Sequence, residues 1–232
     1  MRVSVIIPAH NEEANLRPLA EALLGLAERR RLDIEIILVD DNSTDTTPKI
    51  ADSLAKKHHN IVALHRRKEP GMGNALKEGT RKAKGKYIVW LMGDRADNLE
   101  TIPIMLRKLD TGYDMVFGSR YIAGGSSGDL NQLKALSSSG YSRLARLVFG
   151  FKVHDITNAF RAFRKVVFDK IKLEAGDFAI SPEFAIKAHL NGYRLGEVPT
   201  TYHNRVFGKT KFRMLKMGLR YLSLLRHRFS KG

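Results

Sequence analysis

Acidic and amide side chains follow two apolar runs near the start of the chain, at the point where each run ends. Pro8 to Glu12 follow the run Val3 to Ile7, and Asp40 and Asp41 follow the run Ile34 to Val39. Carboxylates after two adjacent strands could accept hydrogen bonds from a base and a ribose. Helix caps and turns account for some of these side chains, but they do not require adjacent acids after a buried strand. The pattern favours a nucleoside site.

A further pair of acids, Asp94 and Asp97, follows the apolar run Tyr87 to Met92. Hard divalent cations that bridge phosphates take oxygen ligands, commonly one or two carboxylates together with substrate phosphates. The same spacing is typical of a strand-ending turn followed by a helix that Asp97 or Asn98 caps. The spacing alone leaves both interpretations open, a cation site and a capped turn.

Several cationic side chains could meet the phosphates of a nucleotide. A departing diphosphate develops negative charge on its leaving oxygen, which positive side chains can stabilise. Taken singly, each is more often a surface charge than a ligand, and Arg120, directly after a predicted strand, has the best position. The candidates are Arg66, Arg67, Lys68, Arg120, Arg161, Arg164 and Arg205.

Two common nucleotide-binding motifs are absent from the sequence, and so is cysteine. No Gly-x-Gly-x-x-Gly follows the first apolar run, and no Gly-x-x-x-x-Gly-Lys-Ser/Thr occurs. Dinucleotide-dependent redox chemistry and P-loop hydrolysis are therefore poor interpretations. The lack of cysteine excludes disulfides, thiolate zinc sites and cysteine nucleophiles.

Five short apolar runs, rich in β-branched residues, predict strands that are buried on both faces. Segments with helical spacing of apolar residues lie between these runs, so the sequence predicts an α/β fold with a mostly parallel central sheet. Ligands of such sheets bind beyond the carboxyl ends of the strands, where the acids lie. The predicted strands are Val3 to Ile7, Ile34 to Val39, Ile61 to Leu64, Tyr87 to Met92 and Asp114 to Phe117.

A segment rich in Gly and Ser, Ile122 to Gly140, interrupts this alternation. Such a composition offers little to bury and many accessible backbone states, so we expect a loop here. We expect its part from Ser126 to Ser139 to be a mobile acceptor loop that becomes ordered on substrate binding. The total of 232 residues suits one large α/β domain rather than two.

The C-terminal segment is strongly basic. The net charge of the chain is +16, and no acid follows Glu197. We expect a catalytic domain over residues 1–210 and a basic amphipathic helix over residues 211–232, which either lies on an anionic membrane surface or packs on the domain. Because no apolar run reaches about 18 residues and no signal peptide is evident, we expect a cytoplasmic protein, peripheral on the cytoplasmic membrane face.

Taken together, these residues resemble family 2 glycosyltransferases, and within them the dolichol-phosphate mannose synthase-like group. The matching segments occur in the family's order and span residues 3 to about 211. One departure is at the usual Asp-x-Asp, where Met92 takes the first Asp position and Asp94 the second. The segments are Val5 to Glu13, Val39 to Thr47, Gly71 to Ala75 with Gly79, Met92 to Asp94, Gly112 to Val116 with Gly118 to Tyr121, Asp155 to Arg164, and Gly192 to Pro199.

The resemblance implies a single domain of the GT-A fold, a nucleotide-sugar donor and a divalent metal, Mg²⁺ or Mn²⁺, that Asp94 binds. It also implies that Arg120, Arg161 and Arg205 meet phosphates. We expect Asp94, Asp97 and Arg120 to carry the catalysis. The expected substrate-binding residues are Pro8, Ala9, Glu12, Asp40, Asp41, Lys68, Gly73, Arg161, Arg205 and Lys211.

The function that these features favour is an inverting transfer of mannose or glucose from a GDP- or UDP-sugar to a polyprenyl or dolichyl phosphate. A phosphate nucleophile is already charged near neutral pH, since its second pKa is about 6, and needs no strong base. One alternative transfers the sugar to a hydroxyl of a glycan or protein, which would need a base such as Asp97 or Glu183. The other alternative is a non-catalytic nucleotide- or nucleic-acid-binding module. No aromatic stacking pattern accompanies the basic residues, so we expect no nucleic acid partner.

Overall fold

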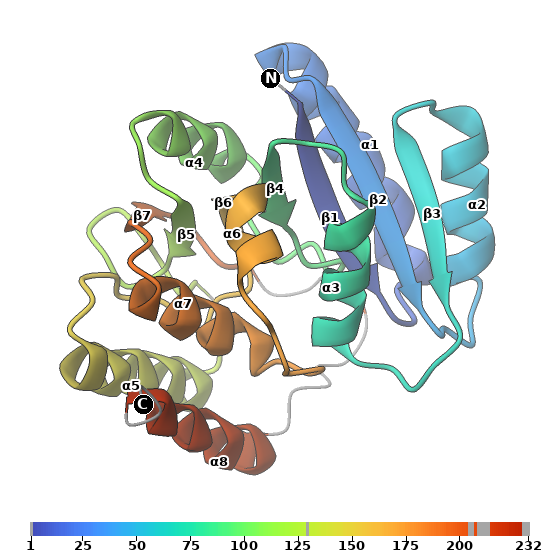
Figure 1. Cartoon of the computed structure of the whole chain (residues 1–232). Coiled ribbons are helices and arrows are strands. Elements are labelled where there is room, and N and C mark those ends of the chain that lie inside the picture. Colours follow the sequence, from blue (N-terminus) through green and yellow to red (C-terminus); the bar gives the residue numbers. More distant parts are fainter. Residues whose placement is uncertain (1, 129, 204–206, 208–213, 229–232) are drawn as a thin grey trace.

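The computed structural model describes residues 2–128, 130–203, 207 and 214–228, and for residues 214–216, 227 and 228 it describes the backbone alone. Within these ranges the chain forms one sheet covered by helices on both faces (Figure 1). The strands are β1 (Val3–Ala9), β2 (Ile34–Asp41), β3 (Ile61–Arg66), β4 (Tyr87–Trp90), β5 (Met115–Ser119), β6 (Arg161–Arg164) and β7 (Leu195–Pro199).

The sheet has the strand order β3-β2-β1-β4-β6-β5-β7. Only β6 runs antiparallel to its two neighbours, β4 and β5, and the other described pairs are parallel. All five strands predicted from the apolar runs are confirmed, within a few residues at their ends. The sequence did not identify β6 and β7, because neither forms an uninterrupted apolar run.

Two hydrophobic layers cover the two faces of the sheet. The side chains of β1 show the division, since Ile6 packs into one layer and Val5 and Ile7 pack into the other, as the strand period of two requires. One layer contains residues of α1 (Glu13–Arg30), α2 (Thr47–Lys57) and α4 (Thr101–Asp110). The opposite layer contains residues of α3 (Met72–Lys82), α5 (Gln132–Phe149), α6 (Lys165–Lys170), α7 (Ile180–Leu190) and α8 (Met214–Leu224).

The segment expected to be a loop is helical in its second half. Helix α5 begins at Gln132, inside the range that its composition assigned to a loop. The side chain of Asn131 caps the helix by accepting hydrogen bonds from the backbone N–H groups of Leu133 and Lys134. The loop prediction therefore fails from Gln132 onward, because an N-cap and helical leucine spacing outweigh the serines of the first turns.

The described part of the C-terminal segment also contains a helix, α8, and this helix packs on the domain. Met217 and Tyr221 of α8 are buried in the same hydrophobic layer as α5 and α7. Figure 1 shows α8 beside α5, and the rings of Tyr221 and Tyr141 meet at 4.9 Å. A short 3₁₀ turn, Leu225–Arg228, follows. No helix within the described ranges has the length and hydropathy to cross a membrane.

Candidate functional site

A cavity of about 1050 Å³ opens beyond the carboxyl ends of the parallel strands. Four strands bring residues to it, because β1, β2, β4 and β5 all end at this edge of the sheet. The sequence predicted this edge, and the cavity brings together many of the predicted residues. Those that line it are Pro8, Ala9, Glu12, Asp41, Asp94, Asp97 and Arg120.

The two acids at the end of β2 have different surroundings. Asp41 lines the cavity, and its carboxylate accepts hydrogen bonds from the backbone N–H of Gly71 at 2.6 Å and from the buried guanidinium of Arg66. Asp40 does not line the cavity. One of its oxygens accepts from the backbone N–H of Ser43 and the other lies 3.2 Å from a ring nitrogen of His65. Asp41 is therefore the acid of this pair that can meet a ligand directly.

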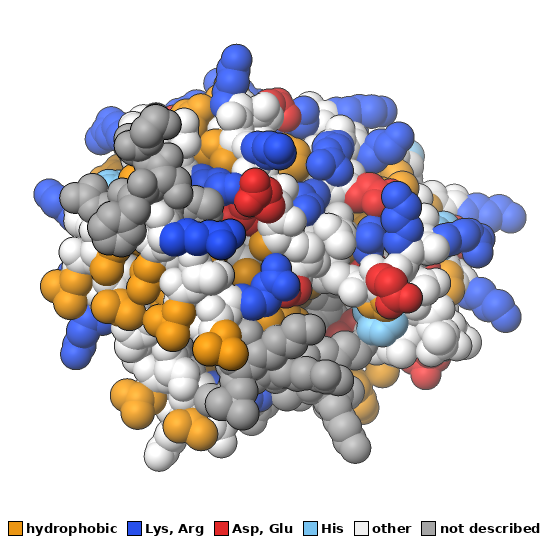
Figure 2. Space-filling view, turned by 60° about the horizontal axis from the view of Figure 1, so that its bottom comes forward, with side chains coloured by type: hydrophobic (Ala, Val, Ile, Leu, Met, Phe, Trp, Pro, Cys, Tyr) orange, Lys and Arg blue, Asp and Glu red, His pale blue; other side chains and the backbone are white. Residues whose placement is uncertain are grey.

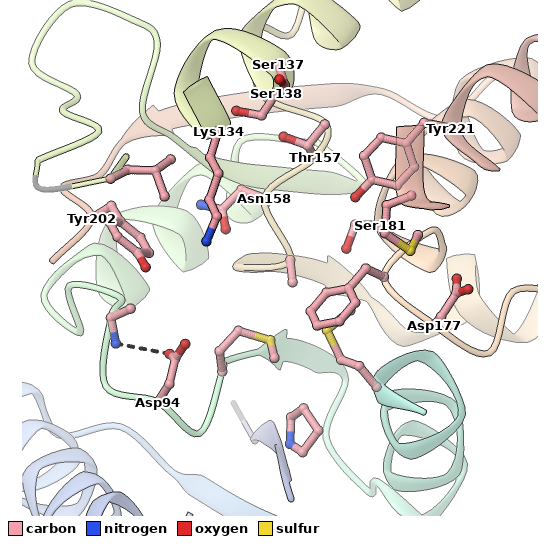
Figure 3. Close-up of a pocket in the computed structure, with 18 of the residues that line it drawn as sticks. Asp94, Lys134, Ser137, Ser138, Thr157, Asn158, Asp177, Ser181, Tyr202 and Tyr221 are labelled. Carbon is pink, nitrogen blue, oxygen red and sulfur yellow. Dashed lines mark hydrogen bonds between the residues drawn. The ribbon is translucent and has the colours of Figure 1, made fainter. Parts of the chain in front are cut away.

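A tight turn after β4 carries the other two acids. Arg95 has a φ of +62°, which a non-glycine residue adopts only when its surroundings hold it there. The turn directs the carboxylate of Asp97 back onto the backbone N–H of Met92, at 3.4 Å. Asp94 accepts from the backbone N–H of Ala96 at 3.2 Å and points into the cavity (Figure 3).

The pKa of Asp97 is raised from its ordinary value of 3.8 to about 7. Burial of the carboxylate is the largest cause, and the negative charge of Asp94 is the next. A carboxyl group that titrates near neutral pH inside a cavity is typical of functional sites. Asp97 can therefore exchange a proton under physiological conditions.

The chemistry of this turn fits a divalent cation that completes its coordination from a ligand. The described part of the chain contains no group of three or more His, Asp or Glu side chains that could hold a metal by itself. Mg²⁺ and similar cations do not require such a cage, because they are commonly bound by one or two carboxylates together with substrate phosphates. The carboxylate of Asp94 points into the cavity, and its negative charge is, after burial, the second cause of the raised pKa of Asp97.

Arg120 is held at the cavity wall by a buried acid. Its Nε and Nη2 donate to the two carboxylate oxygens of Asp155 at 2.7 and 2.9 Å, and Nη2 also lies 3.3 Å from the hydroxyl of Thr157. Burial opposes the charge of Arg120, but the charge and hydrogen bonds of Asp155 outweigh it and raise the pKa of the guanidinium. Arg120 is therefore a fixed positive charge, oriented by Asp155.

The wall opposite Asp94 consists of residues that the sequence analysis did not assign to a site. Figure 3 shows the side chain of Lys134 pointing from α5 into the cavity, with Ser138 on the same helix and Thr157 and Asn158 close by. Tyr221 reaches the cavity from α8. One signal was available for Thr157 and Asn158, since both lie in the matched segment Asp155 to Arg164.

The structure does not bring four predicted residues to the cavity. Asp40 is one of them, and Lys68 is exposed before α3. Gly73 lies at the packed start of α3, where an added Cβ would come within 2.8 Å of the carbonyl oxygens of Ala175 and Asp177. Arg161 is fully buried. Two further predicted residues, Arg205 and Lys211, lie outside the described residues.

Arg161 uses its guanidinium inside the protein. It donates hydrogen bonds to four backbone carbonyl groups, including that of Ser181 at 2.8 Å and that of Asn158. Its guanidinium also packs over the rings of Trp90 and Phe117. These contacts give Arg161 the role of fixing the backbone that precedes β6, on which the cavity residues Thr157 and Asn158 lie.

Glu183, a candidate base for a hydroxyl acceptor, is likewise committed to internal contacts. Its carboxylate accepts from the backbone N–H groups of Glu174 and Ala175 and from the ammonium of Lys187. It is buried and does not line the cavity. Of the two acids considered as a base, Asp97 alone lies at the cavity within the described structure.

Known proteins resemble this chain over most of its length. Residues 4–172 match the family model for glycosyl transferase family 2. The chain is 32% identical over 230 residues to a dolichol-phosphate mannosyltransferase from Pyrococcus furiosus, covering 98% of this chain and 62% of that protein. It is also 32% identical over 217 residues to a polyprenol monophosphomannose synthase from Mycolicibacterium smegmatis, covering 90% of this chain and 80% of that one.

Solved structures share the fold at lower identity. Glucosyl-3-phosphoglycerate synthase from Mycobacterium tuberculosis, in complex with Mn²⁺, uridine diphosphate and phosphoglyceric acid, superposes with a TM-score of 0.73 at 18% identity. The match covers 99% of this chain and 78% of that one. The same enzyme with Mn²⁺ and UDP-glucose gives a TM-score of 0.74 at 18% identity, over 98% and 78% of the two chains. This similarity concerns the fold alone.

Proposed function

Because this chain belongs to glycosyl transferase family 2, we propose that it transfers a hexose from a nucleoside-diphosphate sugar to the phosphate of a polyprenyl phosphate. The two curated relatives, each 32% identical, are named for mannose transfer to dolichol phosphate or for mannosyl phosphopolyprenol synthesis, which supports mannose as the sugar. The chain spans less than two thirds of the Pyrococcus furiosus protein, so the assignment covers the reaction and not every property of that relative.

One observation carries the proposal: a single cavity joins a polar end to an apolar end. The polar end holds Asp41 and Asp94 at the strand edge. The apolar end lies beside α5 and α8, where leucine, methionine and tyrosine side chains of the two helices line it. These side chains are Tyr141 and Leu144 of α5 and Met217, Leu219, Tyr221 and Leu222 of α8. A nucleotide sugar suits the first end, and a phosphate with an isoprenoid chain suits the second.

The polar end is proposed to hold the donor. Pro8 and Ala9 offer backbone and apolar contacts at the end of β1, and Asp41 can accept hydrogen bonds from base or ribose. Asp94, with Asp97 beside it, would hold a Mg²⁺ or Mn²⁺ ion together with the donor phosphates. Such an ion supplies charge neutralisation of the diphosphate leaving group.

Two cations stand on the acceptor side. Arg120 is fixed by Asp155, and Lys134 extends from α5 into the same space. The hydroxyl groups of Thr157 and Ser138 lie on the same wall, where they donate to the carboxylate of Asp155 and to the carbonyl group of Ala135. The two cations can bind the acceptor phosphate and direct one of its oxygens toward the sugar.

The proposed reaction is a direct displacement at the anomeric carbon. The bond from that carbon to the donor diphosphate oxygen breaks, and its electron pair leaves with the nucleoside diphosphate. The bond from the same carbon to an acceptor phosphate oxygen forms, so the anomeric configuration inverts. The acceptor oxygen is already anionic near neutral pH, and no residue of the chain has to remove a proton from it.

A hydroxyl acceptor remains the second candidate because of one specific observation. Asp97 lies at the cavity with a pKa of about 7, which suits a general base at neutral pH. A base of this kind is needed for a glycan or protein hydroxyl and is not needed for a phosphate. Acceptor competition distinguishes the two: polyprenyl phosphate should be consumed, and polyprenol or free sugars should not.

The face around the apolar end is proposed to rest on a lipid surface. Figure 2 shows hydrophobic side chains gathered at the lower left of this face, over α5 and α8. Leu133, Leu136 and Leu147 of α5 are 60%, 70% and 79% exposed, and Leu219 and Leu222 of α8 are 73% and 51% exposed. Soluble proteins seldom expose apolar side chains in such a cluster unless it contacts a partner or a membrane.

Charge and position favour a membrane over a protein partner for this face. The chain has a net charge of +16, which attracts it to anionic lipids at about 1 kcal/mol for each nearby cation. The same helices line the apolar end of the cavity, so an isoprenoid chain can pass from a bilayer into it without crossing water. The sequence analysis assigned the membrane contact to residues 211–232 alone, whereas the proposed membrane-binding face also includes α5.

Vesicle co-sedimentation tests the membrane contact. Replacement of Leu133, Leu136 and Leu147 together by Gln should sharply reduce pelleting with anionic vesicles, because it removes the most exposed leucines of α5. A matched control replaces three exposed apolar residues elsewhere, Val62, Ile104 and Val166, by Gln. Equal pelleting of the two triple variants would contradict the proposed face.

A further inference from the structure

Helix α8 forms a wall of the cavity. Met217 and Tyr221 are 4% and 7% exposed, and both line the cavity together with Gly218, Leu219 and Leu222. The helix is anchored beside the cavity by an ion pair of 3.1 Å between Arg220 and Asp177. Helix α8 is thus a structural part of the site and contributes side chains to its interior.

Among the α8 residues that line the cavity, Tyr221 carries a hydroxyl group. Figure 3 shows its hydroxyl pointing into the cavity on the side of Ser181. Its ring rests on Tyr141 at 4.9 Å, which fixes the direction of the hydroxyl. The charges that act on this hydroxyl include those of Asp177, Arg120 and Arg161.

The protonation state of Tyr221 suits a hydrogen-bond donor. Burial, and after it the charge of Asp177, raise the pKa of Tyr221 above its ordinary value of 10.0. The hydroxyl therefore stays protonated throughout the physiological range, and it can donate to an anion without carrying a charge that repels it. Burial also strengthens a hydrogen bond to an anionic oxygen, because little water competes for it.

We infer that Tyr221 belongs to the acceptor subsite, where its hydroxyl donates a hydrogen bond to an oxygen of the acceptor phosphate. This inference rests on the proposed function. Tyr221 would act beside Arg120 and Lys134, closing the subsite from the side of α8. A tyrosine there also discriminates between acceptors, since an isoprenoid alcohol lacks the anionic oxygen that the hydroxyl would bind.

The position of Tyr221 in α8 has a consequence for the lipid surface. Leu219 and Leu222, its near neighbours in the helix, belong to the exposed apolar face. Helix α8 thus carries two kinds of group. Its leucine side chains would contact lipid, and the hydroxyl of Tyr221 would contact the phosphate of the lipid substrate. Seating of α8 on a bilayer and completion of the acceptor subsite are therefore linked.

Binding of a water-soluble acceptor analogue tests the inference. Geranyl phosphate is titrated by calorimetry into the full chain and into Tyr221→Phe, which removes the hydroxyl and keeps the ring on Tyr141. We expect the variant to bind geranyl phosphate about tenfold or more weakly, the usual effect of losing a hydrogen bond to a charged group. The affinity for geraniol and the affinity for the nucleoside diphosphate should each be the same in the two proteins.

Tyr113→Phe is the matched control, because it deletes the same atom from a tyrosine that does not line the cavity. The inference is overturned if Tyr221→Phe and wild type bind geranyl phosphate equally. It is also overturned if the variant loses affinity for geraniol to the same extent, since that result means lost packing. If wild type binds no geranyl phosphate at all, both the inference and the proposed function fail, which separates that case from the first two.

Discussion

Asp97→Asn should make the protein more stable at alkaline pH, although it alters a residue of the proposed site. The variant keeps the shape of the side chain and an oxygen that can accept from the backbone N–H of Met92. It removes a negative charge that burial and Asp94 disfavour. Functional sites often contain charged residues that lower the stability of the folded protein.

The size of this change in stability follows from the shift in the pKa of Asp97. The ordinary pKa of an aspartate is 3.8, and the pKa of Asp97 in the folded protein is about 7. Because the folded state holds its proton up to the higher pKa, it binds more protons than the unfolded state between these values. Stability is therefore full below pH 3.8 and falls as the pH rises toward 7. The complete loss is on the order of 4 kcal/mol, of which roughly 2.5 kcal/mol falls between pH 5 and pH 8.

Urea unfolding at several pH values between 5 and 8, in the presence of EDTA, measures this effect. The free energy of unfolding of Asp97→Asn minus that of wild type should grow by roughly 2.5 kcal/mol across the range. His65, whose pKa is also raised, titrates in both proteins, so its contribution cancels in the difference. Asp169→Asn, a change at an exposed acid, should show no such growth. Parallel curves for Asp97→Asn and wild type would refute the assignment of a raised pKa to Asp97.

Three further variants test other parts of the site. Asp155→Asn leaves the guanidinium of Arg120 without its buried counter-charge and should lower the free energy of unfolding by about 3 kcal/mol in urea titration, whereas a loss below about 1 kcal/mol would show that the pair contributes little. Gly73→Ala places a Cβ 2.8 Å from two carbonyl oxygens and should cost about 1–3 kcal/mol in thermal unfolding; an unchanged melting temperature would contradict the close packing at the start of α3. Asp94→Asn should lower the transfer rate about a hundredfold while the fold is retained, and excess EDTA should bring wild type to the rate of the variant. Transfer by wild type that is indifferent to EDTA would exclude the cation role of Asp94.

The part of the site on the parallel strands could be predicted from the sequence. Strands buried on both faces need continuous apolar runs, and such runs end visibly at Asp41 and Asp94. Ligands bind at that edge in any fold of this kind, so the position of these acids along the chain also gives their position in space.

The acceptor wall could not be predicted in the same way. Lys134 and Tyr221 lie on α5 and α8, far apart in the sequence, and only the packing of both helices over the sheet brings them to one cavity. The role of Arg161 could not be predicted either. The sequence around this arginine would be the same whether its guanidinium binds a phosphate or four backbone carbonyl groups. Burial, which decides between these roles, depends on the surrounding helices.

Product formation in vesicles tests the central proposal most directly. The full chain is incubated with Mg²⁺ or Mn²⁺, with GDP-mannose, UDP-mannose or UDP-glucose, and with vesicles that contain either a polyprenyl phosphate or the corresponding polyprenol. Mass spectrometry should detect a hexosyl phosphopolyprenol and an equal amount of released nucleoside diphosphate with one of the donors, and no glycosylated polyprenol. Absence of the phospholipid product with every donor, or transfer to the polyprenol instead, would contradict the proposed function.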